Sequence, residues 1–120
     1  MISQEQAAAF GREWIDAWNR HDLDAIVGHY DDAVVFRSPF VATLAAEPSG
    51  TLRGQARLRA YFAEALRKYP DLRFTDLRAL AGVSSVTLTY RSVNNLHAAE
   101  VMTLNEAGRV VGVDAHYAAP

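Results

Sequence analysis

Two stretches in the first half of the chain place apolar residues at helical spacing. In the first, charged side chains occupy the opposite side, and the apolar positions at i, i+4, i+7 and i+8 are Phe10, Trp14, Ala17 and Trp18. Ser3 followed by Gln6 is a capping-box pattern at the start of this helix. The second stretch predicts a helix from Gly54 to Tyr69, which Pro70 ends.

A shorter helix is predicted between these two. Asp22 suits a helix cap, and the apolar side chains that follow it share one side: Leu23, Ile26, Val27 and Tyr30. Asp31 and Asp32 end this helix before an extended run, residues 34–36, which stops at Ser38-Pro39 because proline cannot donate to a strand ladder. Residues 40–53 have a mixed pattern with a turn signal at Pro48, which favours a hairpin flap or a loop.

The second half of the chain reads as strands. Residues 72–80 and 86–93 are extended runs, and residues 99–117 form a β-hairpin around the turn from Asn105 to Gly108. The predicted order is therefore two helices, a strand, a flap, a helix and four antiparallel strands. Three helices against one curved antiparallel β-sheet make an α+β fold, cone-shaped with an internal cavity.

One face of the final hairpin is apolar except for Glu100. Because strand side chains alternate, that face also carries Ala98, Met102, Leu104, Val111, Val113, Ala115 and Tyr117. An unpaired, buried Glu100 is expected to have a raised pKa and to donate a hydrogen bond to a ligand oxygen when protonated. Two alternatives stay open: another strand register, or an ordinary ion pair between Glu100 and Arg91 or Arg109.

Composition narrows the classes of function. The chain has 120 residues, half of them apolar, and we expect one soluble domain over residues 1–120. With a net charge of −2, the chain lacks the excess of basic residues that is typical of proteins that bind nucleic acid or an anionic membrane. There is no cysteine, which excludes disulfides, thiolate catalysis and Cys-based metal sites. The first residues do not read as a signal peptide, and no apolar run is long enough to span a bilayer, so a cytoplasmic protein is expected.

Several short motifs carry a family resemblance. They are residues 19–26 (NRHDLDAI), residues 30–34 (YDDAV), Ser38-Pro39, residues 52–55 (LRGQ) and the hairpin at residues 105–111. With these motifs the chain resembles the nuclear transport factor 2-like superfamily, which includes SnoaL-like polyketide cyclases, limonene epoxide hydrolase, scytalone dehydratase and ketosteroid isomerase. The resemblance covers essentially the whole chain and implies a cystatin-like α+β roll. It is much less specific for activity, because one fold hosts many functions.

The resemblance to ketosteroid isomerase assigns a role to Glu100. In that enzyme the residue eight before the hairpin glycine is the protonated acid of the oxyanion hole, and counting back from Gly108 gives Glu100. The other working positions differ: Trp14, Ser38 and Phe62 stand where that enzyme has a tyrosine, an aspartate base and a second tyrosine. Steroid isomerisation is therefore not expected. The closing strand also lacks the acids and bases of related hydrolases and cyclases, since its inner face offers Val113 and Ala115.

Other side chains are candidates for the site. His29 is a candidate catalytic base near neutral pH, although a histidine in this place more often only covers the helix end. Asp114 and His116 share a strand face, but two side chains are too few for a metal site, so neither a metal nor a cofactor is expected. The predicted ligand-binding residues are Trp14, Trp18, Tyr30, Ser38, Phe62, Tyr90, Met102, Val113 and Ala115.

Three functions compete at this point. The first is an isomerase, cyclase or lyase that acts by proton transfer, with Glu100 as the pocket acid and His29 or water moving the proton. The second is a binder of a small hydrophobic molecule without catalysis. The third is a dimerisation module with a vestigial cavity. In each case we expect a homodimer that pairs through the sheet, as the resemblance implies.

Overall fold

The computed structural model describes residues 1–120 and contains a six-stranded sheet with four α-helices. The helices are α1 (Gln4–Asn19), α2 (Leu23–Val27), α3 (Pro39–Leu44) and α4 (Gln55–Lys68), with a 3₁₀ turn, η1, at Val93–Asn95. The strands are β1 (Tyr30–Arg37), β2 (Thr51–Arg53), β3 (Thr75–Ala81), β4 (Ser85–Arg91), β5 (His97–Leu104) and β6 (Val110–Ala118). None of the helices has the length and apolar character needed to cross a membrane.

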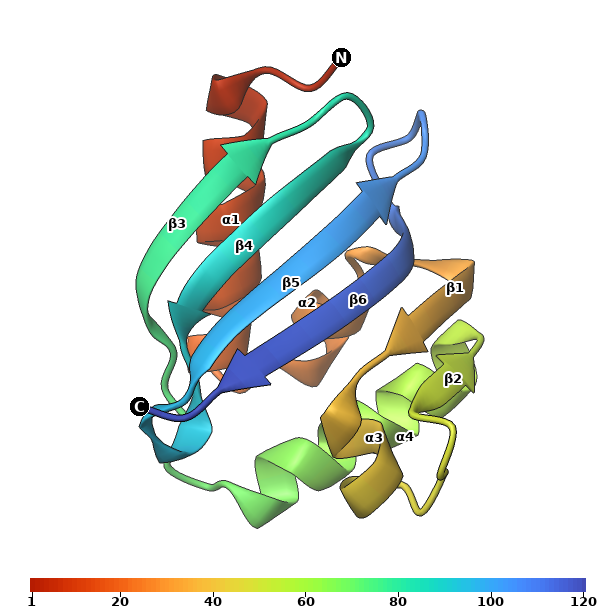
Figure 1. Cartoon of the computed structure of the whole chain (residues 1–120). Coiled ribbons are helices and arrows are strands. Elements are labelled where there is room, and N and C mark those ends of the chain that lie inside the picture. Colours follow the sequence, from red (N-terminus) through yellow and green to blue (C-terminus); the bar gives the residue numbers. More distant parts are fainter.

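The sheet has the order β2-β1-β6-β5-β4-β3 and is curved. All neighbouring strands are antiparallel except β1 and β6, which run parallel. The helices lie on one face and leave the other face of β3 to β6 uncovered (Figure 1). The predicted α+β fold is therefore confirmed, with two differences: the sheet is mixed, and α3 makes a fourth helix.

Local chemistry explains where the helices begin. Ser3 and Gln6 form the predicted capping box, with reciprocal hydrogen bonds of 3.0 Å and 2.9 Å. The side chain of Asp22 accepts a hydrogen bond from Ala25 N and caps α2. Tyr30, however, is the first residue of β1 and does not belong to α2, because α2 ends at Val27 after little more than one turn.

The mixed segment after Ser38 folds into ordered elements, which corrects the prediction of a flap or loop. Ser38 caps α3 by accepting a hydrogen bond from Phe40 N, and Pro39 occupies the first helical turn, where its missing N–H has no cost. The chain then returns so that Ser38 N donates to Gly50 O, and β2 pairs with β1 at the edge of the sheet. Gly50 has a φ of +70°, a backbone conformation that favours glycine.

The predicted faces of the central strands are largely confirmed. Val86, Leu88 and Tyr90 of β4 are buried, as are Ala98, Glu100 and Met102 of β5. In β6 the prediction fails at the start of the strand: Val110 is fully buried and Val111 is only partly so. A register shift between Thr103 and Leu104 inserts an extra residue opposite β5, and such a bulge changes which side chain faces inward.

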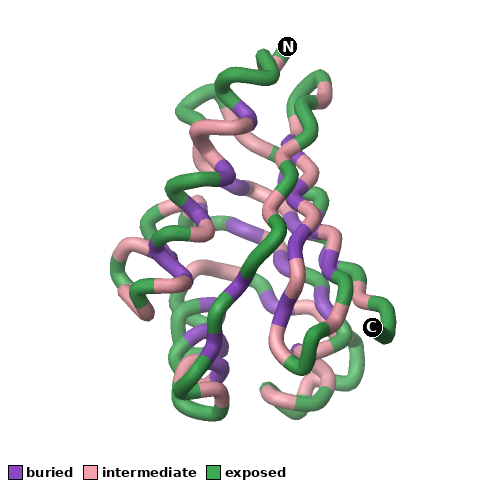
Figure 2. Tube along the Cα trace, turned by 90° about the vertical axis from the view of Figure 1, so that its left-hand side faces the viewer, coloured by how far each residue is buried: buried purple, intermediate pink, exposed green.

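The buried residues gather between the helices and the sheet. Figure 2 shows this layer between the helical turns on one side and the strands on the other. One contiguous cluster of 23 buried apolar residues fills it, including both tryptophans and, from α4, Leu58, Tyr61 and Phe62. Gly11 allows α1 to approach the sheet closely, since a Cβ there would lie 3.2 Å from Leu88 and 3.3 Å from Ala79.

Candidate functional site

A small cavity lies inside the aromatic core, between α1, α4 and the concave face of the sheet. Its volume is about 50 Å³. Its walls include both tryptophans, all five tyrosines and four of the five phenylalanines of the chain, with Phe10 as the exception. Aromatic walls with few polar groups are typical of sites for small apolar ligands.

Glu100 is the only carboxyl group on the cavity wall. It lies on the inner face of β5, with Leu88 of β4 and Ala115 of β6 as its cross-strand neighbours, and it is 4% exposed. No cation reaches it: Arg91 contacts Asn95 and His97, and Arg109 donates to the carbonyl of Tyr30. The ion-pair alternative is therefore excluded, and Glu100 is a buried acid without a counter-charge.

The environment of Glu100 raises its pKa to about 7, against an ordinary value of 4.5. Burial is the main cause, because removal from water disfavours the charged form. A hydrogen bond donated by the hydroxyl of Tyr90 acts in the opposite direction and stabilises the carboxylate. Near neutral pH Glu100 is therefore present in both protonation states, and its neutral form has a proton to donate.

Two tyrosines lie near Glu100, one on each neighbouring strand. The residue between them on β5 is Ala98, whose small side chain leaves room for both. Ala98 pairs with Tyr90 on one side and with Tyr117 on the other, two positions before Glu100 on the same face. Diagonal neighbours of this kind are within reach of long side chains. Burial, and then the proximity of Glu100, raises the pKa of both phenols above the usual value of 10, so both remain neutral hydroxyl groups.

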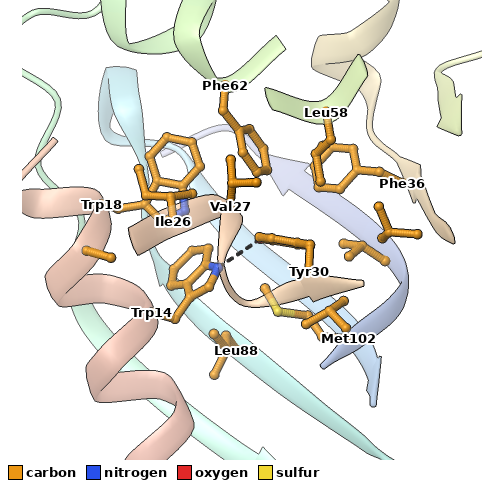
Figure 3. Packing of buried hydrophobic residues seen from close by; sticks show 14 of the residues in the cluster. Trp14, Trp18, Ile26, Val27, Tyr30, Phe36, Leu58, Phe62, Leu88 and Met102 are labelled. Atoms are coloured by element: carbon orange, nitrogen blue, oxygen red, sulfur yellow. Dashed lines mark hydrogen bonds between the residues drawn. The ribbon is translucent and has the colours of Figure 1, made fainter. Parts of the chain in front are cut away.

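A further pair of aromatic side chains, one from α1 and one from the start of β1, forms another part of the wall. The indole nitrogen Nε1 of Trp14 on α1 donates a hydrogen bond of 3.0 Å to the hydroxyl oxygen of Tyr30, and both side chains are fully buried (Figure 3). The Trp14 ring stacks on Phe74 at 5.7 Å. Tyr30 is fixed in turn by hydrogen bonds to its carbonyl from Gln55 and Arg109. Hydrogen bonds therefore hold this part of the wall at both residues.

Six of the residues predicted for the site lie on the cavity wall: Trp14, Trp18, Tyr30, Phe62, Tyr90 and Glu100. Four others are buried nearby but do not line the cavity. Met102, Val113 and Ala115 pack elsewhere in the sheet face, and the hydroxyl of Ser38 caps α3. The roles of all ten in ligand binding remain predictions.

His29 does not reach the cavity. Its ring makes an edge contact with Phe10, one turn before Trp14 on α1, at 5.5 Å, and its carbonyl accepts a hydrogen bond from Val110 N. Burial lowers the pKa of His29, while Glu13 opposes this effect. Because neither His29 nor its contact Phe10 lines the cavity, the structure does not bring His29 beside Glu100, and its role as a base stays a prediction.

Tyr61 and Tyr117 are wall residues that the sequence reasoning did not select for the site. Both had a usable signal, since Tyr117 shares the inner hairpin face with Glu100 and Tyr61 shares the apolar face of α4 with Phe62. Burial, the larger effect, raises the pKa of both phenols, while hydrogen bonding by the side chain of Ser38, which precedes α3, lowers it. The polar side of the cavity is thus larger than predicted.

A second, open hollow adjoins the cavity and has a volume of about 340 Å³. The two share four wall residues, which are Tyr69, Leu72, Ser92 and Val93. The outer hollow lies between the end of α4 and η1, and it also carries Lys68, Asp71 and Arg73. The cavity and the outer hollow therefore adjoin at this end of α4. No group of three or more potential metal-ligand side chains is found in the structure.

Comparison with known proteins agrees with this description. Residues 11–113 match the family model described as SnoaL-like domain. A SnoaL-like protein of unknown function from Burkholderia thailandensis is 50% identical, with 98% of each chain covered and a TM-score of 0.93. A candidate isomerase of the SnoaL-like family from Agrobacterium tumefaciens is 19% identical, with 95% of this chain and 98% of that chain covered and a TM-score of 0.75.

A candidate ketosteroid isomerase from Kribbella flavida is also similar in fold, with 19% identity, 98% of this chain and 81% of that chain covered, and a TM-score of 0.72. A search of curated proteins found no significant match. The family model covers most of the chain, and the relative from Burkholderia covers nearly all of it. The chain therefore belongs to the SnoaL-like family, within the nuclear transport factor 2-like fold.

Proposed function

We propose that this protein binds a small, largely apolar carbonyl compound, with neutral Glu100 donating a hydrogen bond to the carbonyl oxygen. The observation that carries this proposal is a buried acid on an aromatic cavity wall with no cation beside it. A carbonyl oxygen accepts hydrogen bonds and carries no charge, so it matches a neutral carboxylic acid and an uncharged cavity. A carboxylate ligand would instead face like-charge repulsion from ionised Glu100.

The cavity volume limits the size of the ligand. A cavity of about 150 Å³ holds benzene, and a water molecule needs about 10–15 Å³. At about 50 Å³, the cavity has room for a few waters and must widen even for a single ring. A ligand of one ring is therefore the largest class that modest side-chain movement accommodates, which argues against steroids.

Proton transfer on the bound carbonyl compound is the second candidate function. It is favoured by the pKa of Glu100, since an acid–base catalyst works best when its pKa lies near the working pH. In its ionised form Glu100 would take a proton from the carbon next to the carbonyl and return it afterwards. The hydroxyl of Tyr90 already donates to this carboxylate and would steady it during the transfer.

Titration with cyclohexanone tests both functions. Binding is followed by tryptophan fluorescence in the native chain, in Glu100→Leu, which removes the donor, and in Glu100→Gln, which keeps a donor without acidity. The proposal expects binding that Leu abolishes and Gln partly retains. Equal binding by all three proteins, or by none, would overturn it.

The same samples separate a binder from a catalyst. In D₂O, NMR follows the exchange of cyclohexanone protons next to the carbonyl. A catalyst speeds this exchange in the native chain and loses the effect in both variants. A binder leaves the exchange at its background rate while the titration still saturates.

We also propose that two copies of the chain pair through the uncovered face of the sheet. Val101 lies at the middle of this face, 37% exposed, with Thr87 and Asp114 as its cross-strand neighbours. Apart from Asp114 and His116 on β6, its neighbours on this face are small or β-branched and permit close approach of a second sheet: Thr87, Ala99 and Thr103. This proposal is independent of the ligand.

A further inference from the structure

One polar atom in the interior has no partner. Among buried side-chain nitrogen and oxygen atoms, the indole Nε1 of Trp18 alone lacks a hydrogen-bond acceptor. Trp18 is 5% exposed and is one of the cavity wall residues. Buried donors in folded proteins are nearly always paired, so each exception calls for an acceptor that the protein chain itself does not supply.

The surroundings of Trp18 cannot supply that acceptor. Its ring makes an edge contact with Phe62 at 4.8 Å and lies 5.5 Å from Phe74, and neither carries a polar atom. The neighbouring Trp14 is itself a donor, and its Nε1 is already used by Tyr30. The two tryptophans lie one turn apart on α1, yet only one of them is satisfied within the chain (Figure 3).

We propose that Trp18 Nε1 is a second polar anchor of the cavity, which donates a hydrogen bond to a ligand oxygen other than the one held by Glu100. The inference rests on the proposed function and narrows its ligand class. Glu100 lies on the sheet and Trp18 on α1, so the two donors approach the cavity from different walls. The matching ligand is a single ring with acceptor oxygens at opposite ends, such as a cyclic dione.

This arrangement also explains why a lone water is a poor substitute. A buried water molecule makes about three hydrogen bonds to surrounding polar groups. Beside Trp18, the rings of Phe62 and Phe74 offer a water molecule no further hydrogen-bond partner. An oxygen that belongs to a ring filling the cavity has no such requirement.

Two probes of nearly equal size test the inference: cyclohexanone, with one oxygen, and cyclohexane-1,4-dione, with two. The chain has only two tryptophans, so its ¹H–¹⁵N spectrum contains two indole signals, which Trp18→Phe assigns. We expect the dione to shift the Trp18 indole proton downfield, while cyclohexanone moves it much less. The Trp14 signal, whose N–H is already bonded, is the internal control.

Affinities provide the second measurement. A neutral hydrogen bond changes binding by about two- to tenfold. The native chain should therefore prefer the dione over cyclohexanone by about that factor, and Trp18→Phe should lose this preference. The indole shift in the native chain does not depend on whether this variant folds.

The outcomes separate the inference from the proposed function. If cyclohexanone binds in a Glu100-dependent way but the dione gains nothing and leaves the Trp18 signal in place, the inference is overturned and the proposed function stands. If neither probe binds, both are overturned. A shift of the Trp14 signal alone would also contradict the assignment of the anchor to Trp18.

Discussion

At the scale of single residues, Glu100 links the stability of the fold to pH. Its pKa is about 7 in the folded protein and 4.5 in an exposed carboxyl, so between these values the folded state holds the proton more tightly. Stability therefore falls as pH rises from 4.5 to 7 and stays low above that range. The difference amounts to roughly 3 kcal/mol.

The variant Glu100→Gln removes this titration. We expect the free energy of unfolding of the native chain, measured in urea, to drop by about 3 kcal/mol more than that of the variant between pH 4.5 and pH 8. Parallel pH profiles for the two proteins would show that Glu100 keeps an ordinary pKa.

The affinity for the ligand should depend on the same titration of Glu100. Neutral Glu100 donates the hydrogen bond, so binding of cyclohexanone is expected to weaken as pH rises through about 7. At pH 8 the affinity should be about tenfold lower than at pH 6, because the neutral fraction falls from nearly all to about a tenth. The Gln variant is the control, and its affinity should not vary over this range.

The Trp14–Tyr30 hydrogen bond is a second test at this scale. Tyr30→Phe leaves the buried indole N–H of Trp14 without an acceptor, and we expect it to destabilise the fold by about 1–3 kcal/mol. Tyr69→Phe is a matched control, because no hydrogen bond to the Tyr69 hydroxyl is found and the side chain is only partly buried. Chemical denaturation of both variants measures the difference, and equal losses would contradict the proposed importance of this bond.

At the scale of elements, Gly50 fixes the segment that contains α3 and β2. A Cβ at this position would lie 3.2 Å from the carbonyl oxygen of Ser38, and the φ of +70° is strained for alanine. Gly108, in the β5–β6 turn, has a φ of +78° but open space around it. In Gly108→Ala only backbone strain destabilises the fold, by about 1–2 kcal/mol. Gly50→Ala should destabilise it more, because the close contact with Ser38 adds to the same strain.

Amide hydrogen exchange locates the effect. In Gly50→Ala, the amides of β2 and of the residues paired with it in β1 should exchange faster, while those of β4 and β5 should not change. A uniform increase across the sheet would mean that the segment does not behave as a separate element.

The sequence predicts best the elements in which apolar and polar residues repeat regularly over many positions. The α1 and α4 helices and the faces of β4 and β5 each follow one pattern over at least six residues. Tyr30 was misplaced because a single apolar residue fits a helix face and a strand start equally well. The parallel pairing of β1 with β6 depends on partners about 80 residues away along the chain, which no local pattern contains. The bulge near Val110 lies within the β5–β6 hairpin, where simple alternation of side chains gives no sign of an extra residue.

The candidate site divides in the same way. Glu100 was visible as one charge on an apolar face, and Tyr90 as its neighbour on the preceding strand. The distance of His29 from the cavity was not visible, because it depends on how α1 packs over the sheet. The indole N–H of Trp18 has no hydrogen-bond acceptor nearby, and only the folded chain can reveal this.

At the scale of the whole molecule, the proposed homodimer predicts a change in mass. Val101→Glu places a charge at the middle of the uncovered sheet face and should convert dimer to monomer at micromolar concentration. Val83→Glu is the matched control, because Val83 is 71% exposed in the β3–β4 turn, away from that face. Sedimentation velocity measures both variants, and a monomeric native chain would contradict the proposal.

The strand order has a consequence for how the molecule assembles during synthesis. β6 is made last among the strands but lies between β1 and β5, so it joins the β1–β2 edge to the β3–β5 meander. Until β6 is in place, Tyr30 and Glu100 belong to two separate pieces of sheet. Such long-range pairing is slow and leaves strand edges exposed meanwhile. A ribosome therefore releases nearly all of this chain before its cavity can close.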